Sequence, residues 1–385
     1  MARKFGIYLA AVLVVLVMAP ARAVFAAART ASSGACATWV HSTSPNAGTG
    51  DNNFYGVTAV SARDAWAVGE YFVGVNTRTL IEHWNGTSWN VVSSPNKGPD
   101  DSLDAVYAAS ATDVWAAGNY FNGTVGRTLI EHWNGTAWKV VPSPDTGAGS
   151  NELSSIRGTS GHDIWAAGDA VTSYPTTRTV ILHWDGHRWG IVSSPSVPSA
   201  PNFLSAVRPL SPASAWAAGR YVVGSVSRTL MLRWAAGHWQ IVPSPNVGTG
   251  TNVLRSVYTA TATDAWAVGD YNNGAVDKSL ILHWSGRHWQ RTSSPDAGAG
   301  SNDLSAVGGT SPANIYAVGL AFGGASSQAL ILHWDGKHWR AVPARNPGSA
   351  GNQLDAVFAQ SPASIWAVGS YNNGGFNRTL IERCR

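Results

Sequence analysis

Short apolar runs alternate with polar stretches rich in Gly, Asn, Ser and Pro along most of this 385-residue chain. The order of these runs repeats, because seven segments carry the tetrad W/Y-A-V/A-G. The tetrads begin at Trp66, Trp115, Trp165, Trp216, Trp266, Tyr316 and Trp366, in steps of 49, 50, 51, 50, 50 and 50 residues. A constant period of this length indicates one supersecondary unit per copy, stacked on its neighbours.

Each copy contains four runs with strand character, and the fifth copy is representative. Its runs cover residues 253–260, 264–271, 279–284 and 288–295. In several copies the last two runs are joined by Asn-Gly or Asp-Gly, a strong hairpin signal. Four antiparallel strands at this period are typical of a propeller blade. The sequence therefore predicts an all-β fold, a seven-bladed β-propeller with four-stranded blades.

The two ends of the repeat region complete one another. Residues 378–385 read RTLIERCR and lack the outer strand that follows RTLIEHW in earlier copies. Residues 38–46, TWVHSTSPN, align without a gap with residues 88–96, SWNVVSSPN. We therefore expect the N-terminal strand to complete the last blade and close the ring, which removes the open sheet edges.

The two cysteines fall at this expected seam. Cys384 occupies the register of Trp84, and Cys36 occupies that of Gly86, so both belong to one hairpin turn. Their Cα atoms should then lie within disulfide reach, and we predict a Cys36–Cys384 bond. A lipid-modified Cys36 is the alternative, but Ser33 stands where lipid attachment needs an aliphatic residue.

Composition supports a repeat whose conserved positions serve packing. All 19 tryptophans fall in three registers of the repeat: the W-A-V-G tetrad, the H-W pair, and the residue that closes the last hairpin. Each tryptophan can bury roughly 150–250 Å² of surface. Blade-to-blade packing is therefore the expected role of these side chains.

The N-terminus has the features of a secretory signal. Residues 1–28 combine Arg3 and Lys4 with an apolar run over residues 5–18 and a small-residue region, and cleavage fits after Ala23 or after Ala28. A short segment, residues 29–37, precedes the propeller, residues 38–385. No second apolar run of membrane length follows, so we expect a secreted protein without a membrane span in its mature form. Without residues 1–28 the net charge falls from +4 to +1, and no basic run remains to favour nucleic acid as a partner.

The motif D-x-W-A-V-G…T-L-I-x-H-W-N-G-T-x-W resembles repeats of exported bacterial propeller proteins whose function is mostly unassigned. More distantly, it is similar to kelch and sialidase-type (BNR) propellers. The kelch pattern carries two glycines after the second strand, where this chain has the single glycines Gly69, Gly118 and Gly168. The sialidase Asp-box is only partly matched by NGTSW, and the catalytic arginines and Tyr/Glu pair of that family have no counterpart here. The resemblance therefore implies a fold and leaves the activity open.

Two polar registers accompany the tryptophans. A histidine precedes the second tryptophan at His83, His132, His183, His283 and His333, and arginine replaces it at Arg233 and Arg383. Because each lies in a different blade, we expect hydrogen-bonded structural histidines and no metal site. An acidic residue two positions before the first tryptophan, at Asp64, Asp113, Asp163 and Asp264, alternates with Ser214, Asn314 and Ser364. This interchange predicts a turn cap.

Candidate binding residues follow the tetrad and the longer loop within each copy. A basic register closes that loop at Arg78, Arg127, Arg178, Arg228, Lys278 and Arg378, on the face that also carries Asn52, Asp101, Asn151, Asn202, Asn252, Asn302 and Asn352. Salt bridges or stacking between blades are one interpretation, and a sugar- or anion-binding face is the other. The positions after the tetrad add Glu70, Tyr71, Tyr120, Asp169, Tyr221, Asp270, Tyr271 and Tyr371. Acids beside aromatic rings suit carbohydrate recognition, and equally a solvated rim.

No nucleophile–base pair, zinc motif or phosphate loop is present, and no cofactor is predicted. A radical-copper oxidase of the kelch-like type would need a tyrosine-linked cysteine, and both cysteines are already assigned. The leading hypothesis is a monomeric, non-catalytic binding module for a glycan or a protein, using the loop-rich face. One alternative is a glycan-cleaving enzyme (glycosidase or lyase) that uses acids on that face, since glycosidases need two carboxylates. A purely structural surface protein is the other alternative.

Overall fold

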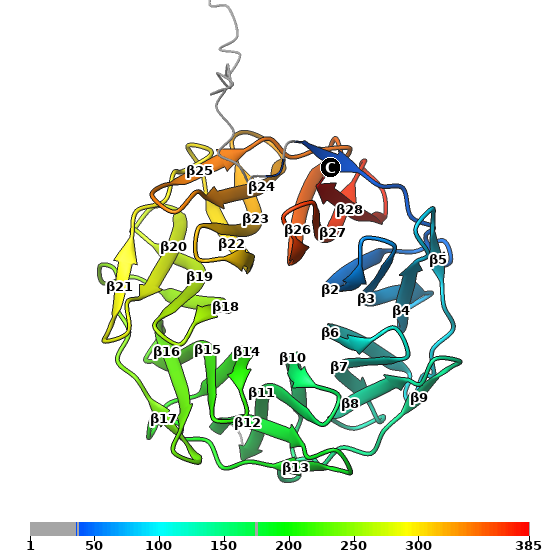
Figure 1. Ribbon diagram of the computed structural model, residues 1–385, viewed down its shortest axis with the longest axis horizontal. Helices are drawn as coiled ribbons and strands as arrows, with labels where there is room; N and C mark the ends of the chain where they lie inside the picture. Colours follow the sequence, from blue (N-terminus) through cyan, green and yellow to red (C-terminus); the bar gives the residue numbers. More distant parts are fainter. Residues whose placement is uncertain (1–35, 37, 174–175, 385) are drawn as a thin grey trace, which may run out of the picture. The chain divides into compact units, whose positions relative to one another are not determined.

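The computed structural model describes residues 36, 38–173 and 176–384, so the predicted signal segment lies outside the described residues. Within those ranges the regular elements are all β-strands, which form seven four-stranded antiparallel sheets. The sheets are arranged around a common centre as the blades of a propeller (Figure 1). The predicted seven-bladed β-propeller is confirmed. No helix among the described residues is long and apolar enough to cross a membrane.

Blades 1 to 6 each use four consecutive strands, and blade 7 combines β26–β28 with β1. The innermost strands are β2 (Asn52–Ser61), β6 (Asp100–Ser110), β10 (Asn151–Ser160), β14 (Asn202–Ser211), β18 (Asn252–Thr261), β22 (Asn302–Ser311) and β26 (Gly351–Ser361). The second strands are β3 (Asp64–Val73), β7 (Asp113–Phe121), β11 (Asp163–Ser173), β15 (Ser214–Val223), β19 (Asp264–Asn272), β23 (Asn314–Phe322) and β27 (Ser364–Asn372). The third strands are β4 (Asn76–Trp84), β8 (Gly126–Trp133), β12 (Thr176–Trp184), β16 (Val226–Ala235), β20 (Asp277–Trp284), β24 (Ser327–Trp334) and β28 (Asn377–Cys384). The outer strands are β5 (Trp89–Val91), β9 (Trp138–Val140), β13 (Trp189–Ile191), β17 (His238–Ile241), β21 (Trp289–Thr292), β25 (Trp339–Val342) and β1 (Trp39–His41).

The tryptophans form the contacts between blades, as the sequence predicts. Trp66 of blade 1 is 1% exposed and packs against both hairpin tryptophans of blade 2. Its ring centroid lies 5.1 Å from that of Trp133 and 5.5 Å from that of Trp138, the latter in an edge-to-face arrangement. The same triplet recurs at five more junctions, so six blades bury the tetrad tryptophan against the outer hairpin of the next blade. At the remaining junction Tyr316 of blade 6 packs edge-to-face on Trp39, with 5.8 Å between the ring centroids.

The seam between the chain ends is closed as predicted. Strand β1 pairs antiparallel with β28, with Trp39 opposite Cys384. A disulfide joins Cys36 to Cys384, whose Cα atoms are 5.5 Å apart. Cys384 is 1% exposed and stands where the other blades carry the H-W tryptophan, so the sulfur fills part of that packing position.

The structure corrects the interpretation of the acidic register. In blade 1, Asp64 does not cap the turn: its Oδ1 accepts a hydrogen bond from His83 Nε2 at 2.9 Å, while the Ser61 hydroxyl accepts the turn N–H. The same pair joins His132, His183 and His283 to the aspartates of their own blades, and His333 to Asn314. The hydrogen-bonded role predicted for the histidines is confirmed. The serines Ser214 and Ser364 occur in the two blades where arginine replaces histidine, so the two registers vary as a pair.

Candidate functional site

One end of the ring carries the longer connections and forms the loop-rich face. These are the hairpin loops between second and third strands and the links from each outer strand to the next innermost strand. They are tied together by backbone bonds such as Phe72 N–H to Asp51 C=O at 2.9 Å and Asn272 N–H to Thr251 C=O at 2.8 Å. The predicted binding residues can therefore be judged by how they lie at this end.

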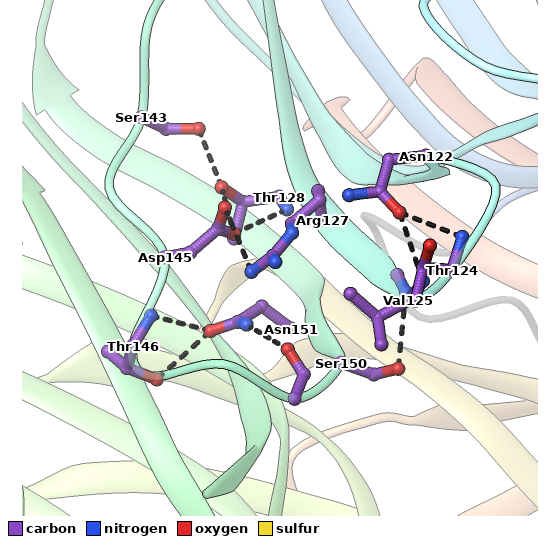
Figure 2. Close-up of polar contacts among 12 residues, drawn as sticks. Asn122, Thr124, Val125, Arg127, Thr128, Ser143, Asp145, Thr146, Ser150 and Asn151 are labelled. Atoms are coloured by element: carbon purple, nitrogen blue, oxygen red, sulfur yellow. Dashed lines mark hydrogen bonds and ion pairs between the residues drawn. The ribbon is translucent and has the colours of Figure 1, made fainter.

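The basic register braces the loops. Arg78 donates to the Gly98 carbonyl at 2.8 Å and lies 3.7 Å from Asp101 of the next blade. Figure 2 shows the equivalent Arg127 directed at Asp145, with 3.7 Å between Nη1 and Oδ2. Lys278 pairs with a loop aspartate, and Arg228 reaches loop carbonyls. These contacts favour the interpretation of salt bridges for Arg78, Arg127 and Lys278, whereas Arg228 makes hydrogen bonds to carbonyls. Arg178 lines a surface pocket with Ser199 and Pro201.

The asparagine register is structural, which corrects its placement on a polar binding surface. Asn151 is buried, and its Oδ1 accepts from the Thr146 amide at 2.6 Å while its Nδ2 donates to the Gly149 carbonyl at 2.8 Å (Figure 2). The other members of the register are also at most 1% exposed, and each accepts a backbone N–H from its own loop. They fix the links between blades and are not available to a ligand.

The tyrosines after the tetrad lie apart from the acids that precede them. Each is partly buried against the hydrophobic cluster between two blades: Tyr71, Tyr120, Tyr221, Tyr271 and Tyr371. Two of them also hold a cation over the ring, at 4.3 Å for Lys97 on Tyr120 and 4.8 Å for Arg291 on Tyr271. The structure does not gather these rings into one aromatic platform.

Two of the acids after the tetrad, Glu70 and Asp270, contact side chains of the innermost strands. The Tyr55 hydroxyl donates to Glu70 at 2.8 Å. Arg255 pairs with Asp270, with 2.8 Å between Nη2 and Oδ1. These contacts join the second strand of a blade to its innermost strand near the loop-rich face.

A cavity of about 120 Å³ occupies the centre of the ring and is lined by the seven innermost strands. At one level these strands present Tyr55, Asp104, Arg255 and Asp355, with serines in blades 3, 4 and 6. Asp104 is bonded to the Ser102 hydroxyl at 3.2 Å, and Asp355 to the Gln353 amide at 3.1 Å. Among the described residues neither carboxylate has a basic side chain within 4.0 Å.

Burial sets the proton affinity of these groups. The pKa of Asp104 is raised to about 7, mainly by burial and to a smaller extent by the charges of Glu70 and Glu152, while the Ser102 hydrogen bond lowers it. Burial likewise raises the pKa of Asp355 and of Asp169 to about 7. Carboxyl groups that titrate near neutrality around one cavity mark a candidate functional site.

The end of the central cavity opposite the loop-rich face carries positive charge. Arg157 and Arg208 line the same cavity and are half-buried. The Arg157 guanidinium lies 5.0 Å from the ring of Phe358 in blade 7, so it reaches across the channel, and Arg208 lies over Tyr258 at 5.1 Å. The cavity is thus acid-rich towards the loop-rich face and basic at its far end.

Comparison with known proteins supports the fold and goes no further. A solved structure described as YCF48 bound to D1 peptide matches with a TM-score of 0.54 and 15% identity, over 90% of this chain and 96% of that one. A protein of unknown function from Dyadobacter fermentans matches with a TM-score of 0.50 and 11% identity, over 73% and 93%. No family model matches the sequence, and the search of curated proteins finds no match. At such identities the likeness concerns the propeller fold alone.

The sequence singled out some of the acidic residues near this cavity as binding candidates. It selected Glu70, Asp169 and Asp270, but it missed Asp104 and Asp355. The usable signal was the position after the buried Leu or Phe of each innermost strand, which reads Tyr55, Asp104, Ser154, Ser205, Arg255, Ser305 and Asp355 while its neighbours stay nearly constant. In the part of the chain that the structure describes, no three His, Cys, Asp or Glu side chains are placed to hold a metal ion.

Proposed function

We propose that this protein is an exported binding module that takes a protein segment at the loop-rich face and receives one cationic group of that segment in the central cavity. The observation that carries this proposal is the pair Asp104 and Asp355, two carboxyl groups that line one cavity and, among the described residues, have no basic side chain within 4.0 Å. A lysine, arginine or terminal amino group would supply that partner.

The charge of the cavity mouth supports a cationic ligand. Five acids accompany Asp104 and Asp355 near this end: Glu70, Glu152, Asp169, Asp270 and Asp303. Two arginines stand against them, and Arg255 is already engaged by Asp270 while Arg220 lies over Phe203 at 4.5 Å. A bound cation favours the ionised carboxylates, so binding and proton release are coupled.

The size of the cavity supports a protein ligand over a glycan. Small-molecule sites usually enclose about 300–1,000 Å³, whereas this cavity encloses about 120 Å³, enough for the end of a side chain. The propeller described as bound to D1 peptide offers a precedent for a peptide on this fold. The glycan ligand suggested by the sequence remains the nearest competitor, on the outer part of the same face.

Export completes the proposal. Residues 1–28 have the pattern of a signal peptide, with cleavage after Ala23 or Ala28. A disulfide between Cys36 and Cys384 suits the oxidising compartment that export implies. The resemblance to exported W-A-V-G repeat proteins, and more distantly to kelch and BNR propellers, agrees with this placement. We propose that the mature protein, residues 38–385 with a short leading segment, acts as a monomer.

A glycan-cleaving enzyme is the second candidate, and one observation favours it. Glycosidases combine a carboxyl group of raised pKa with a second carboxylate. Asp104 and Asp355 line one cavity, and burial raises the pKa of each to about 7. A purely structural role predicts neither binding nor turnover.

The proposal is tested with an array of short peptides that differ only in a central Lys, Arg, Ala or Glu, run beside a glycan array with an assay for reducing-sugar release. We expect the Lys and Arg peptides to bind, and D104N/D355N to weaken their binding at least tenfold. Because the carboxylates must ionise, binding of these peptides should strengthen between pH 6 and pH 8.

The control is D185N, since Asp185 lies in an outer hairpin turn where blades 1 and 2 carry Asn85 and Asn134. It should bind as the wild type does. Cationic peptides that bind D104N/D355N normally would overturn the proposal. Sugar release that is lost in D104N or D355N would establish the enzyme instead.

A further inference from the structure

Two arginines project into the channel at the end opposite the loop-rich face. Arg157 belongs to β10 of blade 3 and Arg208 to β14 of blade 4, at the same register of neighbouring innermost strands. Each guanidinium lies against an aromatic ring, Phe358 for Arg157 and Tyr258 for Arg208. Both arginines line one cavity, and they are close enough for the charge of Arg208 to act on Arg157.

Neither arginine has an anionic partner. Within residues 38–173 and 176–384, no carboxylate oxygen lies within 4.0 Å of either guanidinium, and neither donates a hydrogen bond. Asp113 and Asp163 are close enough to act on Tyr107, which the arginines also influence, but each is bonded to the histidine of its own blade. Burial, together with the charge of Arg208, lowers the pKa of Arg157 to about 9. Burying a charge and placing two like charges close together are both unfavourable. A bound anion would offset the burial of the guanidinium groups and the repulsion between them.

Space for such an anion exists beside the two guanidinium groups. They face the central cavity of about 120 Å³ and also line a smaller pocket of about 20 Å³. Blade 6 contributes Gly308 and Gly309 to this pocket, where the other blades present Thr, Tyr, Arg or Phe at the first of these positions. The pocket therefore has a wall without side chains at these two positions of blade 6, facing the two arginines.

We propose that Arg157 and Arg208 form a binding site for a small oxyanionic group, a phosphate, sulfate or carboxylate, at the far end of the channel. Guanidinium groups match the geometry of such oxyanions and bind them through paired N–H donors. The site is independent of the peptide site at the loop-rich face, because it uses other residues and the opposite charge.

A different role would be purely structural. In that case Arg157 and Arg208 only fill the channel by stacking on Phe358 and Tyr258, which contributes to stability without any ligand. The two roles predict opposite behaviour. If the role is structural, R157Q and R208Q are less stable than the wild type in every buffer. If the arginines bind an anion, the stability of the variants does not respond to oxyanions, and without oxyanions they are as stable as the wild type.

The test uses the full mature protein with its disulfide intact, in a chloride-free, low-ionic-strength buffer. Sodium phosphate, sodium sulfate and sodium acetate are each titrated by calorimetry, and thermal unfolding is followed in parallel. We expect saturable millimolar binding of at least one anion and a rise in Tm with its concentration, as ligand binding to the native state requires. R157Q and R208Q should each weaken that binding at least tenfold, and R157K should have an intermediate effect.

R287Q is the control, because Arg287 is an exposed arginine of an outer hairpin and its loss changes the net charge equally. It should bind the anion as the wild type does. Glucose 6-phosphate and a sulfated monosaccharide distinguish a free inorganic ion from the anionic group of a larger ligand, since only an accessible site admits them. The proposal is overturned if the wild type binds none of the three salts, or if R157Q/R208Q binds them unchanged.

Discussion

At the scale of single residues, the least expected feature is a set of glutamates inside the hydrophobic interior. Glu82, Glu131 and Glu382 are fully buried in the third strands of blades 1, 2 and 7, three consecutive blades. Leucine occupies the same register in the other blades, at Leu182, Leu232, Leu282 and Leu332. Among the described residues, no hydrogen-bond partner reaches either carboxyl oxygen of Glu82 or Glu131. Burial raises the pKa of Glu82 to about 9 and that of Glu131 to about 8, so both are protonated at neutral pH.

We predict that these glutamates make the protein more stable in mild acid than at alkaline pH. Glu82 keeps its proton in the folded chain up to about pH 9, whereas the unfolded chain releases it near the ordinary carboxyl pKa of about 4.3. Below that value the group adds no pH dependence. Above it, the free energy of unfolding should fall by about 1.4 kcal/mol per pH unit for this one residue, until the folded pKa is passed.

The measurement is urea denaturation from pH 5 to pH 8 for the wild type, E82Q and E82L. E82Q should flatten the pH dependence, and E82L should also raise the free energy of unfolding by about 1–2 kcal/mol, because it removes a buried polar group without a partner. Identical pH profiles for the wild type and E82Q would refute the assignment of a buried, protonated Glu82.

At the scale of elements, the links between blades depend on one amide side chain each. Asn252 is fully buried at the start of β18; its Oδ1 accepts from the Val247 amide at 2.7 Å, and its Nδ2 donates to the carbonyls of Val247 and Gly250. The link therefore has a fixed shape although it contains no regular structure. This matters for function because the same links build the loop-rich face.

We predict that N252A lowers the free energy of unfolding by about 2 kcal/mol, because it leaves buried backbone groups unpaired. N252D should be milder, since it keeps the acceptor, and blade 2 uses Asp101 in this register. N90A, which removes an exposed asparagine of β5, is the matched control and should change stability by less than about 0.5 kcal/mol. Denaturant unfolding measures the stability of all three variants. Equal effects of N252A and N90A would contradict the stabilising role of the Asn252 hydrogen bonds.

At the scale of the whole molecule, the ring is closed by a short strand and one covalent bond. Strand β1 has only three residues, and the disulfide beside it joins positions separated by 348 residues. Closure of a loop of this length is worth about 5–6 kcal/mol in the chain-entropy view, an upper value. The bond thus contributes much of the free energy that keeps the N-terminal strand in blade 7.

We predict that the double variant C36S/C384S folds but loses several kcal/mol of unfolding free energy, with the loss centred on the seam. Hydrogen exchange should accelerate first in β1 and β28, while β10 and β14, on the opposite side of the ring, stay protected (Figure 1). Adding a reductant to the double variant should have no further effect. Two free thiols in the folded, secreted wild type would contradict this account.

The sequence by itself determined the architecture, because the same strand pattern occurs in seven copies. The period near 50 residues, the three tryptophan registers and the alignment of residues 38–46 with 88–96 specified blade number, strand number and ring closure. The Cys36–Cys384 bond followed from the same alignment. Local patterns suffice for the architecture because the tryptophan contacts that hold the blades together join adjacent blades, so one copy predicts these contacts for the others.

Only the tertiary structure decided which polar residues share a site. Asp104 and Asp355 are 251 positions apart in the chain yet line one cavity, and Arg157 meets Phe358 across it. The pairing of Asp64 with His83 was hidden for a related reason, since the sequence displays both registers but not the antiparallel register that brings them together. Side chains that point to the centre meet partners from distant blades, and the burial that raises their pKa comes from the ring as a whole. The chemistry of the channel is therefore a property of the closed ring and cannot be read from any single repeat.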